Sequence, residues 1–145
     1  MVYIGSMAAE GQSRTINPTI DEISDALFHM QQSVFDYLLL ESVDNTSSLI
    51  IRGGRNDQGA RQYFCILGLV STVDDAGYAV DFCEYALVNT EIENEKEVDL
   101  VSEDSEVTLS SRFVVSYDLV LLACITYYLE GKMDPLLKWD VYNSG

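Results

Sequence analysis

The chain has 145 residues, 48% of them hydrophobic, so it can build one domain with a core and is too apolar to be disordered. Its 24 acidic and 8 basic residues give a net charge of −16, which disfavours nucleic acid and anionic membrane surfaces and favours basic protein partners. The same acidity is expected of a protein that is merely soluble. No apolar run approaches the roughly 20 residues of a membrane-spanning helix.

The beginning of the sequence predicts no secretory signal, because it has neither a basic segment nor a long apolar one. Gly5-Ser6 in front of Met7 has the pattern of a cloning remnant before a native start. We therefore expect residues 1–15 to be a tag or a disordered leader, and residues 16–145 to form a single domain.

Residues 19–32 predict the first element, an amphipathic helix. Thr19 and Glu22 are spaced as a capping box, in which each side chain bonds to the other residue's backbone amide. Apolar residues then recur at helical spacing, at Ile20, Ile23, Leu27 and Met30. Asp21, Glu22 and Asp25 are expected on the solvent side.

A run of strands follows. The predicted strands are Phe35–Val43, Ser48–Arg52, Gln62–Val70, Tyr78–Val88, Glu95–Val101 and Glu106–Val115. Gly53–Gly59 is read as a long hairpin tip between two of them. The Gln62–Val70 strand is almost wholly apolar and is expected to be central.

The last part of the chain predicts a second helix and a final strand. Ser116 is placed to cap the helix, whose apolar middle is expected to be buried against the sheet, and Gly131 is placed to end it. Leu136–Val141 reads as the final strand. The predicted fold is α+β, a mainly antiparallel sheet of about six to seven strands packed with two helices, one near each end of the sequence.

The sequence offers little for catalysis. His29 is the only histidine, which rules out a pair of histidine zinc ligands, and no nucleotide-binding, nucleophile-elbow or EF-hand motif occurs. The cysteines Cys65, Cys83 and Cys124 lie in apolar stretches, which favours buried free thiols in a reducing cytoplasm over a disulfide or catalytic thiol. We expect no catalytic residues, no metal and no cofactor. A small enzyme that uses carboxylates alone stays open as an alternative.

Acidic residues are densest between positions 91 and 106, where eight acidic residues and one basic residue give a net charge of −7. The first five fall on every second residue, and in a strand such side chains stand about 6–7 Å apart on one face. An anionic row can enter a basic groove made for phosphates, or it can simply keep a sheet edge from aggregating. The candidate partner-binding residues are Glu91, Glu93, Glu95, Glu97, Asp99, Glu103, Asp104 and Glu106. Candidate aromatic anchors beside them are Tyr78, Phe82 and Tyr85.

The stretch from Val115 to Trp139 resembles the closing segment of the immunity-protein family that neutralises nucleic-acid deaminases and other toxins of bacterial polymorphic toxin systems. The resemblance covers about 25 residues and consists of a strand, a capped helix with an aromatic near its end, a glycine, a proline and a tryptophan on the last strand. The matching positions are Ser116, Asp118, Ala123, Tyr128, Gly131, Pro135 and Trp139. Relative to the commonest spacing in that family, this sequence has one extra residue between Gly131 and Pro135. The matching residues are scaffold positions, and they assign no binding site.

The resemblance implies a protein that acts by binding and catalyses no reaction. It implies a cytoplasmic bacterial protein that binds a cognate toxin domain, expected to be basic and to be a nucleic-acid deaminase or nuclease, in a one-to-one complex that covers the active site. Neither nucleic acid nor a membrane is an expected partner. The alternative function is an adaptor or chaperone for a basic secreted effector, which would bind its partner without inhibiting it.

Overall fold

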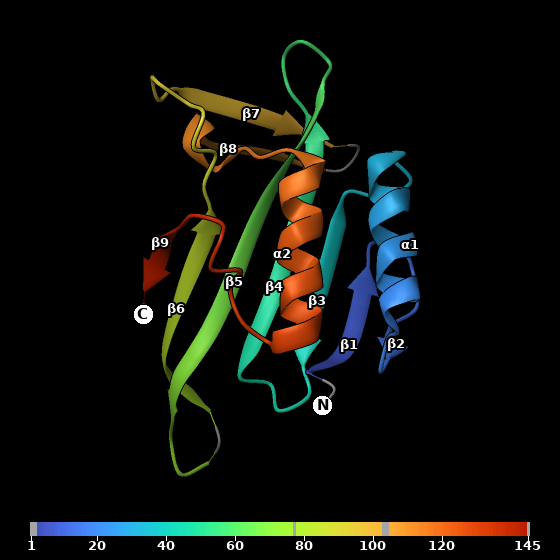
Figure 1. Cartoon of the computed structure of the whole chain (residues 1–145), viewed down its shortest axis with the longest axis vertical. Helices are drawn as coiled ribbons and strands as arrows, with labels where there is room; N and C mark the ends of the chain where they lie inside the picture. The colour runs from blue at the N-terminus through green and yellow to red at the C-terminus, as the bar shows by residue number, and fades with distance from the viewer. Residues whose placement is uncertain (1–2, 77, 103–104, 145) are drawn as a thin grey trace.

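The computed structural model describes residues 3–76, 78–102 and 105–144. Within them, nine strands form one antiparallel sheet, and two helices lie on one of its faces (Figure 1). The helices are α1 (Ile20–Gln31) and α2 (Tyr117–Glu130), with a short 3-10 turn over Ser111–Phe113. The strands are β1 (Ile4–Ala9), β2 (Thr15–Ile16), β3 (Tyr37–Ser42), β4 (Ser47–Arg55), β5 (Arg61–Val73), β6 (Ala79–Leu87), β7 (Glu97–Val101), β8 (Glu106–Ser110) and β9 (Trp139–Ser144). The predicted α+β class is confirmed.

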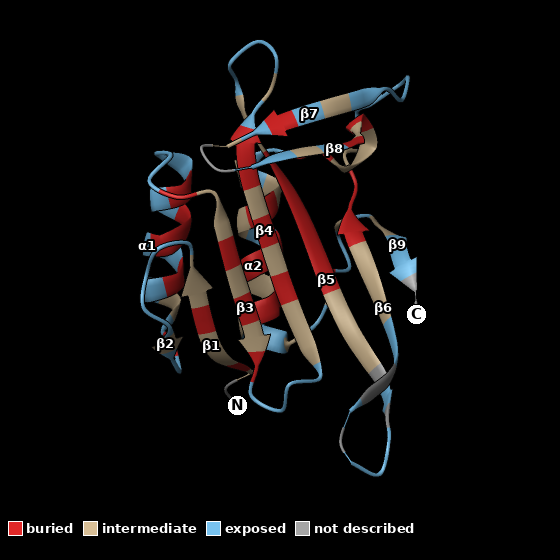
Figure 2. Cartoon of the chain, turned by 180° about the vertical axis from the view of Figure 1, so that it is seen from behind, coloured by how far each residue is buried: buried red, intermediate tan, exposed pale blue. Residues whose placement is uncertain are grey.

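The main sheet runs in the order β2-β1-β3-β4-β5-β6-β9. β5 is central, as predicted, and pairs with β4 on one side and β6 on the other. The hairpin of β7 and β8 joins this sheet through one pair, between Arg55 of β4 and Val101 of β7. It lies across one end of the sheet, as Figure 2 shows from behind.

Two apolar clusters lie on opposite faces of the same strands. Cys65 and Leu67 of β5 join the main cluster beneath the helices. Phe64 and Ile66 point the other way and join a second cluster with Leu100 and Leu109 of the β7–β8 hairpin. Side chains alternate along a strand, so β5 serves both clusters and fixes the hairpin on the face away from the helices.

The cap of α1 is confirmed. The Thr19 hydroxyl accepts from the Glu22 amide and the Glu22 carboxylate accepts from the Thr19 amide, each at 3.1 Å. Ile23, Leu27 and Met30 are buried, and the predicted solvent-side acids are exposed. This local signal was sufficient because capping and helical spacing depend on neighbours in sequence.

α2 departs from prediction in two respects. Ser116 occupies the cap position, but its side chain makes no capping hydrogen bond. The helix buries Val120 and Tyr127, whereas Leu122 and Leu129 are 48% and 61% exposed, so it is not enclosed on every side.

The expectation that residues 1–15 lie outside the fold is wrong for the described part of that segment. β1 pairs with β3 from Ile4 to Ala9, and Ile4 is fully buried in the main cluster. Small residues such as Gly5 and Ala8 hide this strand from sequence reasoning, because its order comes from pairing with distant β3.

Other predicted element boundaries also differ in the structure. Gly53 and Gly54 belong to β4 and not to the hairpin tip. A Cβ at Gly54 would stand 3.0 Å from the Leu100 Cβ, so the glycine lets the β7–β8 hairpin approach the sheet. Residues 111–113 form a 3-10 turn where a strand was predicted, and the final strand begins only at Trp139.

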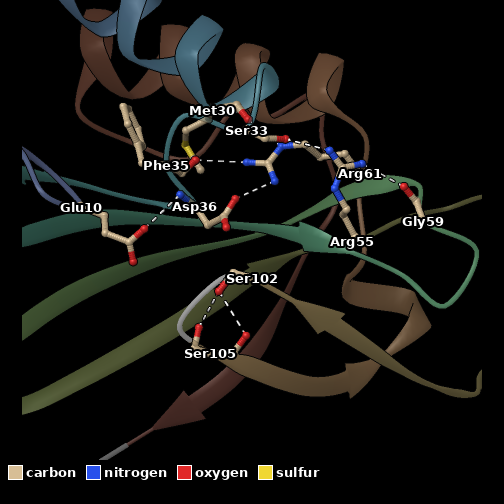
Figure 3. A network of polar contacts seen from close by, with 10 residues as sticks. All are labelled: Glu10, Met30, Ser33, Phe35, Asp36, Arg55, Gly59, Arg61, Ser102 and Ser105. Atoms are coloured by element: carbon tan, nitrogen blue, oxygen red, sulfur yellow. Dashed lines mark hydrogen bonds and ion pairs between the residues drawn. The ribbon is translucent and has the colours of Figure 1, made fainter.

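A polar network joins the end of α1 to the sheet (Figure 3). Arg61 of β5 donates from Nε to the Met30 carbonyl at 2.6 Å and from Nη2 to the Phe35 carbonyl at 3.1 Å. Its Nη1 pairs with Asp36 Oδ1 at 2.6 Å. One guanidinium therefore fixes the connection from α1 into β3.

Candidate functional site

The acidic surface predicted from the sequence lies on the hairpin of β7 and β8, here called the acidic hairpin. Leu100 and Leu109 point into the second cluster, with Val98 and Val107 packed beside them. The alternate residues Glu97, Asp99 and Glu106 are therefore on the outer face, and all three are exposed.

The first half of the acidic row is not a strand. Residues 90–96 form a turn and a loop, so the prediction that Glu91, Glu93 and Glu95 share a strand face with Glu97 and Asp99 is wrong. All three are nevertheless exposed in the segment that leads into β7. The two remaining candidates, Glu103 and Asp104, lie outside the described residues.

The carboxylates differ in their partners. Asp99 accepts a hydrogen bond from the Thr108 hydroxyl at 2.6 Å, across the β7–β8 pair. Glu95 accepts from Ser110 Oγ at 3.2 Å and lies 3.8 Å from Arg112, which also pairs with Asp140. Within the described part of the chain, Glu97 and Glu106 have neither a hydrogen bond nor an ion pair to their side chains, so their charges face solvent.

A pocket of about 430 Å³ opens between β7 and the tip of the β4–β5 hairpin. Its lining includes the charged residues Asp57, Glu97, Asp99 and Lys96. Side-chain amides complete much of the lining, at Asn56, Gln58, Gln62 and Asn89. This lining offers hydrogen-bond acceptors to a polar or cationic side chain beside the acidic face.

The candidate aromatic anchors do not lie beside the acidic hairpin. Tyr78 is exposed in the turn between β5 and β6, at the opposite end of the sheet (Figure 1). Phe82 pairs with Val70 on the face away from the helices and is 38% exposed. Tyr85 is only half-buried and pairs with Leu67, on the helix-bearing face. The structure thus separates the three residues that the sequence grouped.

The thiols and the histidine lie apart from the acidic hairpin. Cys65 and Cys124 are fully buried, and burial raises the pKa of both thiols well above the ordinary value. Cys83 is half-buried, all three cysteines are free, and His29 is exposed. Among the described residues, no three His, Cys, Asp or Glu side chains gather closely enough to hold a metal ion. Neither α1 nor α2 is of a length and apolarity that would cross a membrane.

Two of the residues that carry the sequence resemblance, Gly131 and Trp139, have the predicted scaffold roles, whereas the Ser116 side chain makes no capping hydrogen bond. Gly131 ends α2 in the left-handed conformation with φ of 69°, and its amide donates to the Tyr127 carbonyl. Trp139 packs against the main cluster and donates from Nε1 to the Asp134 carbonyl at 3.3 Å. These contacts order the end of α2 and hold the start of β9 against the main cluster.

Comparison with known proteins returned no match of any kind, whether to a protein-family model, to a curated protein or to a solved structure.

Proposed function

We propose that the protein is an immunity protein that binds a basic toxin domain of a bacterial polymorphic toxin system and inhibits it by covering its active site. The observation that carries the proposal is the outer face of the acidic hairpin, where Glu97, Asp99 and Glu106 are exposed together. An enzyme that acts on nucleic acid has a basic groove for phosphates, and a row of carboxylates is complementary to it. A nucleic-acid deaminase or a nuclease is therefore the proposed target.

Long-range charge also supports this proposal. The chain carries a net charge of −16, and opposite charges accelerate the encounter of two proteins. Rapid association suits an inhibitor that must reach its toxin before the toxin reaches nucleic acid. In such complexes charge mainly sets the association rate and partner choice, while affinity comes from a few buried contacts.

An adaptor for a basic effector is the second candidate, and one feature favours it. In the described sheet β9 pairs only with β6, so its other edge has open backbone groups, and Val141 and Tyr142 are exposed on it. An extended segment of another protein can add to an edge of this kind as a further strand.

Co-purification from the source bacterium distinguishes these functions. The tagged protein is recovered at moderate salt, the co-purifying chain is identified by mass, and its nuclease and deaminase activities are measured with and without this protein. A toxin domain whose activity is blocked in a one-to-one complex is the expected result. A partner that stays fully active would favour the adaptor. The absence of any partner from cells that express such a toxin would contradict both.

A further inference from the structure

The helices leave the opposite face of the sheet open. Figure 2 shows this face, crossed only at one end by the acidic hairpin. We define the open sheet face by four apolar residues of the neighbouring strands β3 to β6, namely Leu39, Ile50, Val70 and Phe82. Leu39 pairs with Ile50, and Val70 pairs with Phe82, so the members of each pair share a face.

Burial confirms the direction of these side chains. The alternate residues Leu38, Leu40, Leu49 and Ile51 are fully buried beneath the helices. Leu39 and Ile50 must therefore point to the other side, where they are half-buried. Phe82 is 38% exposed. Large apolar side chains partly open to water across adjacent strands are a property of contact surfaces.

The open sheet face adjoins the second cluster, on which the acidic hairpin packs, because Ile50 pairs with Ile66 of that cluster. Tyr142 of β9 is 45% exposed, and its ring centroid lies 5.2 Å from that of Phe64 and 5.6 Å from that of Phe113. Phe64 belongs to the second cluster, and Phe113 packs against it, as do the inner residues of the hairpin. One partner could thus touch both surfaces.

The charges on this side are unevenly placed. Across the open sheet face, Glu41 pairs with Arg14 at 3.1 Å, and Arg52 lies over the Tyr37 ring. Glu84 accepts from the Asn143 amide. Two exposed carboxylates without partners in the described chain, Glu97 and Glu106, lie on the outer face of the hairpin. An occupant complementary to this side is apolar over the sheet and basic where it meets the hairpin.

We propose that the open sheet face is the apolar contact surface for the basic protein domain described above, and this inference rests on that proposed function. The partner covers Ile50 and Phe82 with an apolar patch and directs its lysine and arginine side chains at the acidic hairpin. The hairpin then governs the association rate, and the sheet face governs how long the complex lasts.

The test uses the co-purified partner chain, purified separately, and three variants. Ile50→Lys and Phe82→Lys place a positive charge on the open sheet face, and Leu122→Lys makes the same change on the outer face of α2, where the side chain is 48% exposed. We expect the first two to raise Kd at least about tenfold, mainly through faster dissociation, and the third to leave it within about twofold. Thermal unfolding checks that all three fold. The reverse pattern would place the partner on the helices and overturn the inference while leaving the proposed function intact.

Footprinting uses the wild-type protein, so a misfolded variant cannot cause its result. Hydroxyl-radical labelling of Phe82 and Tyr142 should fall in the complex, while labelling of Phe28 on α1 should not change. Protection of the sheet with a fully active partner would support this surface and contradict inhibition. Inhibition of the partner without protection of the sheet would support the proposed function and contradict this contact surface. A dimer of the protein alone that Phe82→Lys dissociates would identify a second copy as the occupant and overturn the inference, as would the recovery of no partner.

Discussion

Arg61 and Asp36 form an ion pair, with 2.6 Å between Nη1 and Oδ1, at the seam where the chain leaves α1 and enters β3. Their side chains are only 11% and 17% exposed. The same guanidinium also satisfies the carbonyls of Met30 and Phe35. A partly buried charge with this many fixed partners stabilises one arrangement of helix and sheet.

We predict that Arg61→Ala lowers the free energy of unfolding by about 3 kcal/mol, because it removes the ion pair of the Asp36 carboxylate and the donor to the Phe35 carbonyl. The Met30 carbonyl keeps the Ser33 amide as a donor. Urea unfolding measures the change. Arg55→Ala is the control: Arg55 is exposed and, among the described residues, its side chain donates only to Gly59 and Ser33, so its loss should cost less than about 0.5 kcal/mol. Equal effects of the two substitutions would contradict the role assigned to Arg61.

Gly131 is predicted to be harder to replace than Gly59. Both have positive φ, 69° and 78°, and alanine at either position should cost about 1 kcal/mol for the left-handed backbone. A Cβ at Gly131 would also stand 2.7 Å from Tyr3 Cδ1, whereas a Cβ at Gly59 meets nothing within 4 Å. Denaturant unfolding should therefore show the larger loss for Gly131→Ala. Equal losses would mean that Tyr3 moves aside at no cost.

Charge reversal on the acidic hairpin should slow binding without unfolding the protein. We predict that Glu97→Lys with Glu106→Lys lowers the association rate with the partner about tenfold at low salt, and less at high salt, because screening weakens steering. Stopped-flow mixing measures the rate. Asp75→Lys changes an exposed charge in the turn at the far end of the sheet and should alter the rate much less. An unchanged rate in the double variant would remove the hairpin from the interface.

The three thiols should differ in reactivity. Cys65 and Cys124 are fully buried with a raised pKa, so neither should react with a thiol reagent at about pH 8 in the folded protein. Cys83 is half-buried and should be the thiol that reacts. Mass spectrometry after labelling, with and without denaturant, counts the modified residues. Rapid labelling of all three without denaturant would contradict the packing of α2 on β5.

Asp44 should make the free energy of unfolding depend on pH in the acidic range. Its carboxylate accepts from the Thr46 hydroxyl at 2.6 Å and from the Ser42 hydroxyl at 2.9 Å, and these bonds, with Thr46 foremost, hold the pKa of Asp44 below the ordinary 3.8. A depressed pKa in the folded state contributes stability that is present above the ordinary pKa and is lost as pH falls through the folded value. Asp44→Asn should thus be less stable than the wild type near about pH 6, and the difference should shrink toward about pH 3. Unfolding curves at both pH values measure it, and a constant difference would contradict the assignment.

Local signals were enough to predict much of the fold. The capping box of α1 and the glycine that ends α2 act within one turn of chain. Such features need no knowledge of distant partners. The features that could not be predicted, such as β1, take their order from strands far away in sequence.

The acidic residues 91–99 show the same difference between local signals and contacts with distant residues. Alternating carboxylates form a strand only where the residues between them can reach an apolar cluster. Val98 and Leu100 do so and lie in β7, whereas Asn94 and Lys96 cannot and lie in the loop before it. The charge pattern alone therefore predicted the acidic surface but not its conformation. The open sheet face was missed because single residues such as Leu39 and Ile50 give no sign of which side the helices will cover.

The strand order has a consequence for the ribosome-bound chain. β6 pairs with β9, which is made only after the hairpin and α2, so one side of β6 stays an open edge during much of synthesis. Two nascent chains on one messenger could join through such edges. Asp81 and Glu84 place like charges along this strand, and like charges oppose edge-to-edge association. The charges of β6 thus oppose pairing between two chains that both lack β9.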